Sequence, residues 1–128
     1  MSKSETSGKI LTMFLSVQTH IKIYHFQTKS YARHKTVDQF YNDLTDLLDK
    51  FMEVLQGAWN VRVKMNDSIK LININDKHVI YMLSGFRTWL KTTLPKLLDL
   101  VSSSTDLLNI RDEILEKVNQ TLYLLTFV

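Results

Sequence analysis

The chain has 128 residues, 45% of them hydrophobic and 23% charged, and it contains no cysteine. This composition fits one domain over residues 1–128, and it excludes disulfides, thiolate metal sites, iron–sulfur clusters and cysteine nucleophiles. The formal charge of +3, with basic residues scattered among acidic ones, favours a solvated surface over a nucleic-acid-binding stripe.

The sequence also lacks the features of a membrane or secreted protein. Residues 1–9 are polar, without the apolar centre of a secretion signal, and no apolar run approaches the ~20 residues that span a bilayer. We therefore expect a soluble, cytoplasmic protein with no membrane partner.

Two amphipathic helices are expected in the first half of the chain. Over residues 9–28, apolar side chains recur at three- and four-residue spacing, as on one face of a helix. A polar connector at 27–30 leads to a second segment with the same periodicity. Gly57 is expected to end this second helix, because glycine is common at helix C-termini.

The segment after Gly57 changes character. Over residues 58–76, apolar and polar residues alternate, and Asn66 and Asp67 suggest a turn between the alternating stretches. This pattern predicts either a small β-hairpin at 60–75 or an irregular crossover.

Helical spacing returns in the last part of the chain. One helix is expected over residues 79–101, kinked or divided at Pro95, and another over 107–128 after a break at 102–105. The order is a helix pair, a longer connection and a second helix pair. It predicts an all-α, ferritin-like four-helix bundle with one long crossover.

Four polar residues of the second helix form two chelating pairs. His34 and Asp38 are four residues apart, as are Asp49 and Glu53, so each pair points to one side of the helix and can hold one ion. At 100° per residue the two pairs share one stripe, which flanks the apolar face by roughly 100°. Such a site faces a neighbouring molecule.

The two pairs lie too far apart to share an ion within one chain. His34 and Asp49 are 15 residues apart, which is about 22 Å along a helix, whereas metal–ligand distances are ~2 Å. Two copies of the helix packed antiparallel about a two-fold axis would form two equivalent sites. His25, near the end of the first helix, is a further candidate ligand, with a hydrogen-bonded core histidine as the alternative.

The order of these residues resembles the ferroxidase signature of the Dps-type mini-ferritins. The residues that carry the resemblance are His25, Phe26, His34, Asp38, Asp49, Glu53 and Gly57. The resemblance implies that two-fold related subunits share the binding of iron (Fe2+/Fe3+) and oxidise it with peroxide or oxygen. It also implies a homo-oligomer such as a hollow dodecamer, and a role in iron sequestration and oxidative protection.

A second resemblance concerns residues 109–127 together with the second helix. These are similar to uncharacterised ferritin-like proteins of large DNA viruses, which implies a virion or an infected host cell as the setting.

Two alternatives remain open at this point. The charged pairs can be solvent-facing residues of an exposed helix flank. The protein can also be a non-catalytic helical scaffold, or a module that binds DNA or protein. The connector between His25 and His34 is shorter than in the mini-ferritins, and Phe26 replaces their usual tryptophan, which favours this second alternative. For DNA, Lys3 and Lys9 of a short tail predict weak, salt-sensitive binding.

We expect the remaining histidines and the tryptophans to have structural roles and not to bind a metal. His20 and His78 have no acidic partner at helical spacing, and we expect them at the surface or at helix caps. Trp59 and Trp89 are expected to be packing anchors.

Overall fold

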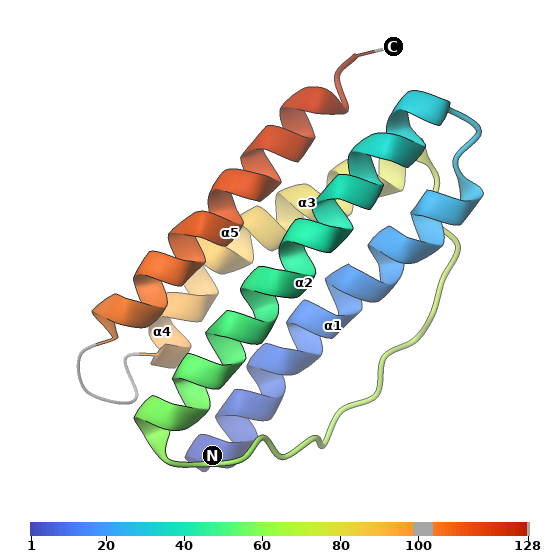
Figure 1. Cartoon of the computed structure of the whole chain (residues 1–128). Coiled ribbons are helices and arrows are strands. Elements are labelled where there is room, and N and C mark those ends of the chain that lie inside the picture. The colour runs from blue at the N-terminus through green and yellow to red at the C-terminus, as the bar shows by residue number, and fades with distance from the viewer. Residues whose placement is uncertain (99–103, 128) are drawn as a thin grey trace.

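The computed structural model describes residues 1–98 and 104–127. Helices make up most of them (Figure 1). The elements in chain order are α1 (Lys3–Gln27), α2 (Tyr31–Trp59), α3 (Asp76–Thr88), the π-helix η1 (Trp89–Thr93), α4 (Leu94–Leu98) and α5 (Thr105–Leu124). In these residues no helix is both long and apolar enough to cross a membrane.

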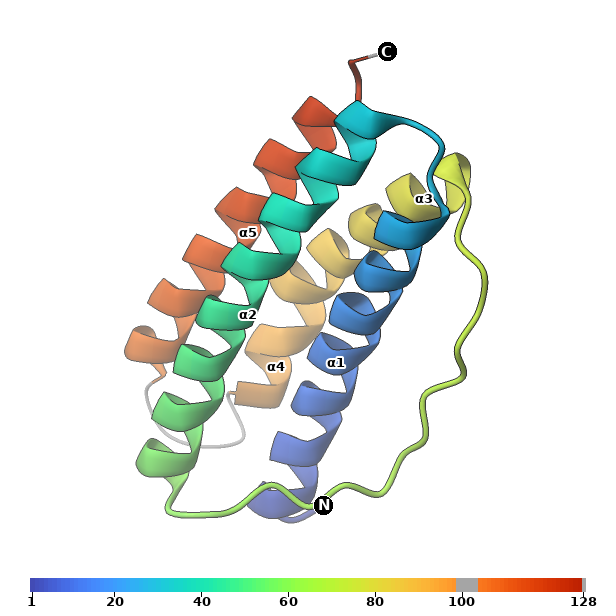
Figure 2. The same cartoon turned by 45° about the vertical axis from the view of Figure 1, so that its right-hand side comes forward.

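The helices form a bundle of four rods, with α3, η1 and α4 following one another along one rod. Helix α2 packs between α1 and α5, and the third rod lies behind them (Figures 1 and 2). Because the segment after α2 returns along the whole bundle, α2 and α3 run in the same direction, opposite to α1 and α5. The predicted all-α four-helix bundle with one long crossover is confirmed, and its connection order is that of ferritin-like bundles.

The crossover, residues 60–75, is extended but contains no strand among the residues described. The alternative of a β-hairpin is therefore wrong, and the irregular crossover is confirmed. The physical reason is that N–H groups of the crossover backbone donate hydrogen bonds to residues of α1 and not to a second strand. The Lys64 N–H donates to the Ser4 carbonyl at 3.2 Å, and the Ile72 N–H donates to Nε2 of His20 at 3.3 Å.

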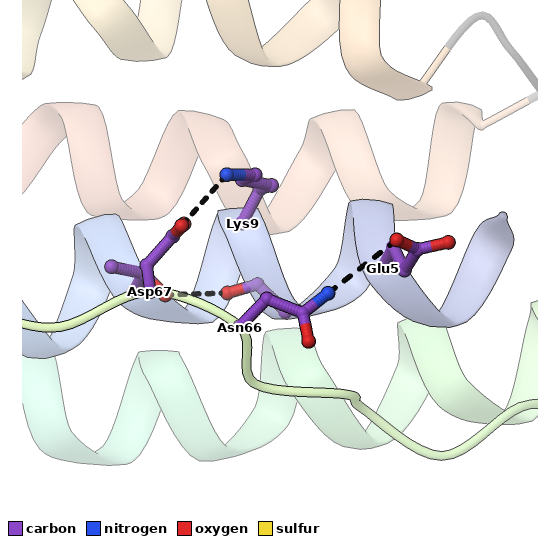
Figure 3. Close-up of polar contacts among 6 residues, drawn as sticks. Glu5, Lys9, Asn66 and Asp67 are labelled. Carbon is purple, nitrogen blue, oxygen red and sulfur yellow. Dashed lines mark hydrogen bonds and ion pairs between the residues drawn. The ribbon is translucent and has the colours of Figure 1, made fainter. Parts of the chain in front are cut away.

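Side chains also tie the crossover to the start of α1. Lys9 donates to Oδ1 of Asp67 at 2.8 Å, and Asn66 donates to Oε2 of Glu5 at 3.4 Å, so that two successive crossover residues are held (Figure 3). On α1, Gly8 lies between Glu5 and Lys9. The Lys64 carbonyl lies against it, and a Cβ added at Gly8 would overlap this carbonyl. Glycine at this position lets the crossover approach the helix closely.

Helix α1 starts earlier than expected, at Lys3 instead of residue 9. Ser2 is its N-cap: the Ser2 hydroxyl accepts from the Glu5 N–H at 3.1 Å, and Oε1 of Glu5 accepts from the Ser2 N–H at 3.3 Å. This reciprocal pair is a capping box, for which the Ser-x-x-Glu spacing is the sequence signal. Lys3 and Lys9, assigned to a tail, both lie in the helix.

Helix α2 continues through Gly57, so the expected end at this glycine is wrong. The helix ends at Trp59, which is 5% exposed and continues the buried face four residues after Leu55. Asn60 then adopts the left-handed conformation, with φ 54° and ψ 51°. Asparagine tolerates this conformation better than most residues, and so takes the place that glycine was expected to fill.

Pro95 divides the third rod, as one of the two alternatives predicted. Proline has no N–H and its ring crowds the carbonyl four residues earlier, so an ordinary turn does not fit around it. The wider π-turn η1 precedes it, and the Leu94 N–H donates to the Trp89 carbonyl five residues back. The end of the expected helix near residue 101 and most of the expected break at 102–105 lie outside the described residues.

The last helix, α5, ends at Leu124, short of the expected end near Val128, which itself is not among the described residues. The bundle core is centred on Phe14 of α1. Its ring lies 5.3 Å from that of Phe51, 6.1 Å from that of Phe86 and 5.7 Å from that of Trp89, all edge to face. Trp89 is thus a packing anchor, as expected.

His20 was expected at the surface or at a helix cap, and both are wrong, because it lies within α1 and only 5% of the residue is exposed. Its Nδ1 lies 2.7 Å from the Ser16 carbonyl, which can only accept, so Nδ1 carries the proton. Nε2 is then the acceptor for the Ile72 N–H. His20 therefore fixes the crossover to α1.

Candidate metal centre

His25 and His34 face each other where α1 ends and α2 begins. Their rings stack with centroids 3.8 Å apart and planes inclined by 21°. Nδ1 of His25 lies 3.1 Å from the His34 carbonyl, and Nδ1 of His34 lies 2.8 Å from the His25 carbonyl. The three-residue connector, 28–30, brings the two backbones close enough for this exchange.

The reciprocal hydrogen bonds determine which nitrogens can act as ligands. A backbone carbonyl only accepts, so both Nδ1 atoms carry a proton. In the neutral ring Nε2 then has the free lone pair, which is the form in which imidazole binds a metal. A hydrogen bond from Nδ1 to a carbonyl is a common support for a metal-binding histidine. His25 is 8% exposed, so the expected alternative of a hydrogen-bonded core histidine also describes it.

Asp38 lies beside the histidine pair, one turn beyond His34 on α2. Its Oδ1 is 3.9 Å from Nδ1 of His25, and its side chain is 40% exposed. The structure thus brings three candidate residues, His25, His34 and Asp38, to one end of the bundle. The nitrogen of His25 nearest to Asp38 is, however, engaged by the His34 carbonyl.

Asp49 and Glu53 lie near the other end of α2, and both are exposed. They line a shallow hollow of about 360 Å³ together with Asp46, Lys50 and Val54. Neither carboxylate forms a hydrogen bond or an ion pair within the part of the chain that is described. Lys50 points elsewhere, since it pairs with Glu113 of α5 at 3.3 Å.

The two chelating pairs do not meet within one chain, because α2 is a single continuous helix from Tyr31 to Trp59. Across residues 1–98 and 104–127, no group of three or more His, Asp or Glu side chains converges to hold a metal ion. The histidine end supplies imidazole nitrogens and one carboxylate, and the other end supplies two carboxylates. Each end is an incomplete ligand set.

Charge is distributed unevenly along α2. Its first two turns carry Arg33, His34 and Lys35 with Asp38 just beyond them, whereas residues 43–53 contain four acids and one cation, Lys50. The helix therefore has a basic first end and an acidic second end. When two copies of such a helix pack antiparallel, each basic end lies against an acidic one.

A hydrogen-bonded group around Tyr24 supports the histidine end, and sequence reasoning missed it. The Tyr24 hydroxyl donates to Asp76 of α3 and accepts from Arg33 of α2. Burial, and next the hydrogen bond to Asp76, raise the pKa of Tyr24 above its usual value. The group joins residues from three separate helices, so no spacing within one segment could have indicated it.

A family model matches residues 25–125, a range that includes all five candidate ligands, and its description is "family of unknown function (DUF5856)". The chain is also 40% identical, over 55 residues, to an uncharacterized 14.6 kDa protein of Enterobacteria phage T4 encoded in the mobD–ri intergenic region. The alignment spans 43% of this chain and 43% of the phage protein, less than half of each. No solved structure matches the chain significantly.

Proposed function

The chain belongs to DUF5856, a family of unknown function, and we propose for this member the binding and oxidation of iron at a site shared by two copies. Fe(II) is the substrate. His34 and Asp38 of one copy bind it together with Asp49 and Glu53 of the other, and His25 lies beside them as a further ligand. Two equivalent sites form about the two-fold axis.

The observation that carries this proposal is the histidine pair. Its reciprocal Nδ1–H···O bonds hold both rings in the tautomer whose Nε2 can bind a metal. A structural role for the pair alone would not require the exposed carboxylate of Asp38 beside it. Imidazole and carboxylate together suit iron, and the negative charge of the carboxylates favours Fe(III) over Fe(II).

The charge pattern of α2 supports the second copy as the partner. Asp49 and Glu53 are exposed and form no ion pair among the residues described, since the adjacent Lys50 pairs with Glu113. An antiparallel second α2 brings Lys35 and the histidine end opposite them, so the long-range attraction favours the arrangement that completes the site.

The proposed reaction is an electron transfer from iron to peroxide. Two Fe(II) ions each lose one electron, and hydrogen peroxide takes up the two electrons and two protons and leaves as two water molecules. Iron is thereby sequestered as Fe(III), and peroxide is consumed. The role we propose is protection against oxidation, and the phage relative is in keeping with a virion or an infected cell as its setting.

A scaffold without iron chemistry is the second candidate, and the burial of His25 favours it. The stacked rings and their two backbone bonds join α1 to α2 whether or not a metal binds. In this case the charged pairs of α2 are merely solvated.

Anaerobic titration with Fe(II) distinguishes the two candidates. We expect the wild type to bind one or two Fe(II) per site and to oxidise them on addition of peroxide much faster than buffer does. Asp49→Ala should abolish stoichiometric binding, because the lost carboxylate is a ligand. Glu116→Ala, which removes an exposed acid from α5, is the matched control and should bind as the wild type does.

The mass in solution gives an independent test. We expect a dimer or a larger even assembly, such as the dodecamer of the mini-ferritins, at micromolar concentration. If the wild type is a monomer with iron present, or if it binds no iron stoichiometrically, the shared site does not exist.

A further inference from the structure

Acidic and basic residues are distributed unevenly among the helices of the structure. Of the 13 acidic residues, five lie on α2 and four on α5. The rod formed by α3, η1 and α4 has the opposite character, since residues 76–98 contain four cations and one acid, Asp76. This rod therefore carries a net positive charge, whereas α2 and α5 each carry a net negative charge.

The lysines of the basic rod are available to a partner. Lys77, Lys91 and Lys96 are exposed, and they form no ion pair with the residues described. Arg87 is partly buried and donates to Asn119 of α5 at 3.2 Å, so it is already engaged. Three cations thus lie along a rod whose residues 77–96 span about 29 Å.

Two acidic residues in or near this rod are already engaged. Asp76 accepts from Tyr24 at 2.6 Å. Asp67 of the crossover is paired with Lys9 at 2.8 Å (Figure 3). The crossover adds the exposed Lys70, which lines a hollow together with Trp89 and Leu97 of the rod. Neither Asp76 nor Asp67 is therefore paired with a lysine of the rod.

An aromatic side chain stands among the lysines. Tyr81 is 79% exposed, the most exposed of the large apolar and aromatic side chains described, and it follows Lys77 by one helical turn. Gly85 and Thr88, both small and exposed, continue the same line along α3. The ring of His78 lies 6.4 Å away and is tilted by 59°, so it does not stack on Tyr81, and a face of the tyrosine is available to a base.

We propose that the outer surface of α3, η1 and α4 binds single-stranded nucleic acid. Lys77, Lys91 and Lys96 contact phosphates, and Tyr81 stacks on a base. A polyanion complements a row of exposed cations whose one described acid, Asp76, is bonded to Tyr24. Single strands are favoured over duplexes because stacking on an exposed ring needs an unpaired base face. This surface is independent of the iron site, which lies on α2.

Fluorescence anisotropy with a labelled oligothymidylate, and with the corresponding duplex, tests the proposal over a series of salt concentrations. The wild type should bind the single strand more tightly, with affinity falling as salt rises. Lys77→Gln with Lys91→Gln should lower the slope of log K against log salt by about 1.4. Lys50→Gln with Lys117→Gln changes the net charge equally on α2 and α5, and should leave the slope unchanged.

A second pair of variants tests the stacking. Tyr81→Ala should weaken single-strand binding about fivefold or more, and Tyr81→Phe should restore it. Tyr123→Ala, which removes a 62% exposed tyrosine from α5, should have no effect. The proposal is overturned if the wild type binds neither strand at low salt, or if both double lysine variants lose affinity equally. It is also overturned if Tyr81→Ala binds as the wild type, or if anionic vesicles are bound in preference to the oligonucleotide.

Discussion

The hydroxyl of Tyr24 donates a hydrogen bond of 2.6 Å to Oδ1 of Asp76, and so joins the end of α1 to the first turn of α3. Arg33 of α2 donates to the same hydroxyl at 3.1 Å and to the carbonyl of Leu125, just after α5, at 2.9 Å. All four rods of the bundle are therefore connected through three side chains and one carbonyl at the end where the histidine pair lies.

Removal of this hydroxyl should destabilise the fold. Tyr24→Phe leaves Arg33 and Asp76 each without one hydrogen-bond partner, and we expect the free energy of unfolding to fall by about 1–2 kcal/mol. Denaturant unfolding followed by circular dichroism measures the change. Tyr123→Phe, at an exposed position, should leave the stability unchanged.

The stability should also depend on pH through Tyr24. Burial, followed by the hydrogen bond to Asp76, raises its pKa in the folded chain above the usual 10.0. Above pH 10 the unfolded chain therefore loses this proton more readily than the folded chain, and the stabilisation declines as pH rises toward the folded pKa. The fall in unfolding free energy above pH 10 should be shallower in Tyr24→Phe than in the wild type. Equal slopes would contradict this explanation.

The three glycines should respond differently to alanine. At Gly8 a Cβ would overlap the Lys64 carbonyl, so Gly8→Ala must displace the crossover, and we expect a loss of about 1–3 kcal/mol. At Gly57 and Gly85 nothing lies within 4 Å of the added atom. Both are helical, and alanine there should stabilise by about 0.5–1 kcal/mol. Thermal unfolding of the three variants makes the comparison, and a neutral Gly8→Ala would show that the crossover does not press on α1.

His20 should control the opening of the crossover. His20→Ala removes the acceptor of the Ile72 N–H, and we expect amide hydrogen exchange at Ile72 and the residues around it to become faster. His78→Ala serves as the control, because it changes a partly buried histidine at the start of α3, next to the crossover. If both variants exchange alike at Ile72, the bond to His20 does not hold the segment.

The bundle could be predicted from the sequence because each helix is indicated by residues that lie close together in the chain. Apolar spacing identifies each helix face, and the loss of that spacing marks the crossover. The errors occur where a tertiary contact decides the outcome. Gly57 does not end α2, since burial of Trp59 extends the helix, and His20 is buried because a distant backbone N–H, that of Ile72, needs its ring nitrogen.

The candidate site was predictable only in part. The four-residue spacings of α2 indicated which side chains share a face, and the structure adds the stacking of His25 on His34. The tautomers of this pair depend on two backbone carbonyls, which no spacing of side chains reveals. In the proposed shared site, the position of Asp49 relative to the histidines of the other chain depends on how two copies pack, and a single sequence does not specify that packing.

Mixing two inactive variants gives the sharpest test of the shared iron site. If the proposal holds, Asp38→Ala lacks a ligand at the histidine end, and Asp49→Ala lacks one at the acidic end, so each homodimer has two defective sites. In a mixed dimer both defects fall in one site and the other site is intact. After co-refolding of equal amounts, half of the dimers are mixed, and about a quarter of the wild-type iron sites should return.

A second mixture controls for nonspecific recovery. Asp49→Ala and Glu53→Ala are defective at the same end of α2, so every site of their mixed dimer lacks one ligand, and no activity should return. Both carboxylates are exposed, and neither is bonded within the described residues, so folding should be unaffected in either variant. Recovery in the first mixture alone requires that ligands come from two chains. Equal recovery in both mixtures, or in neither, would exclude the shared site.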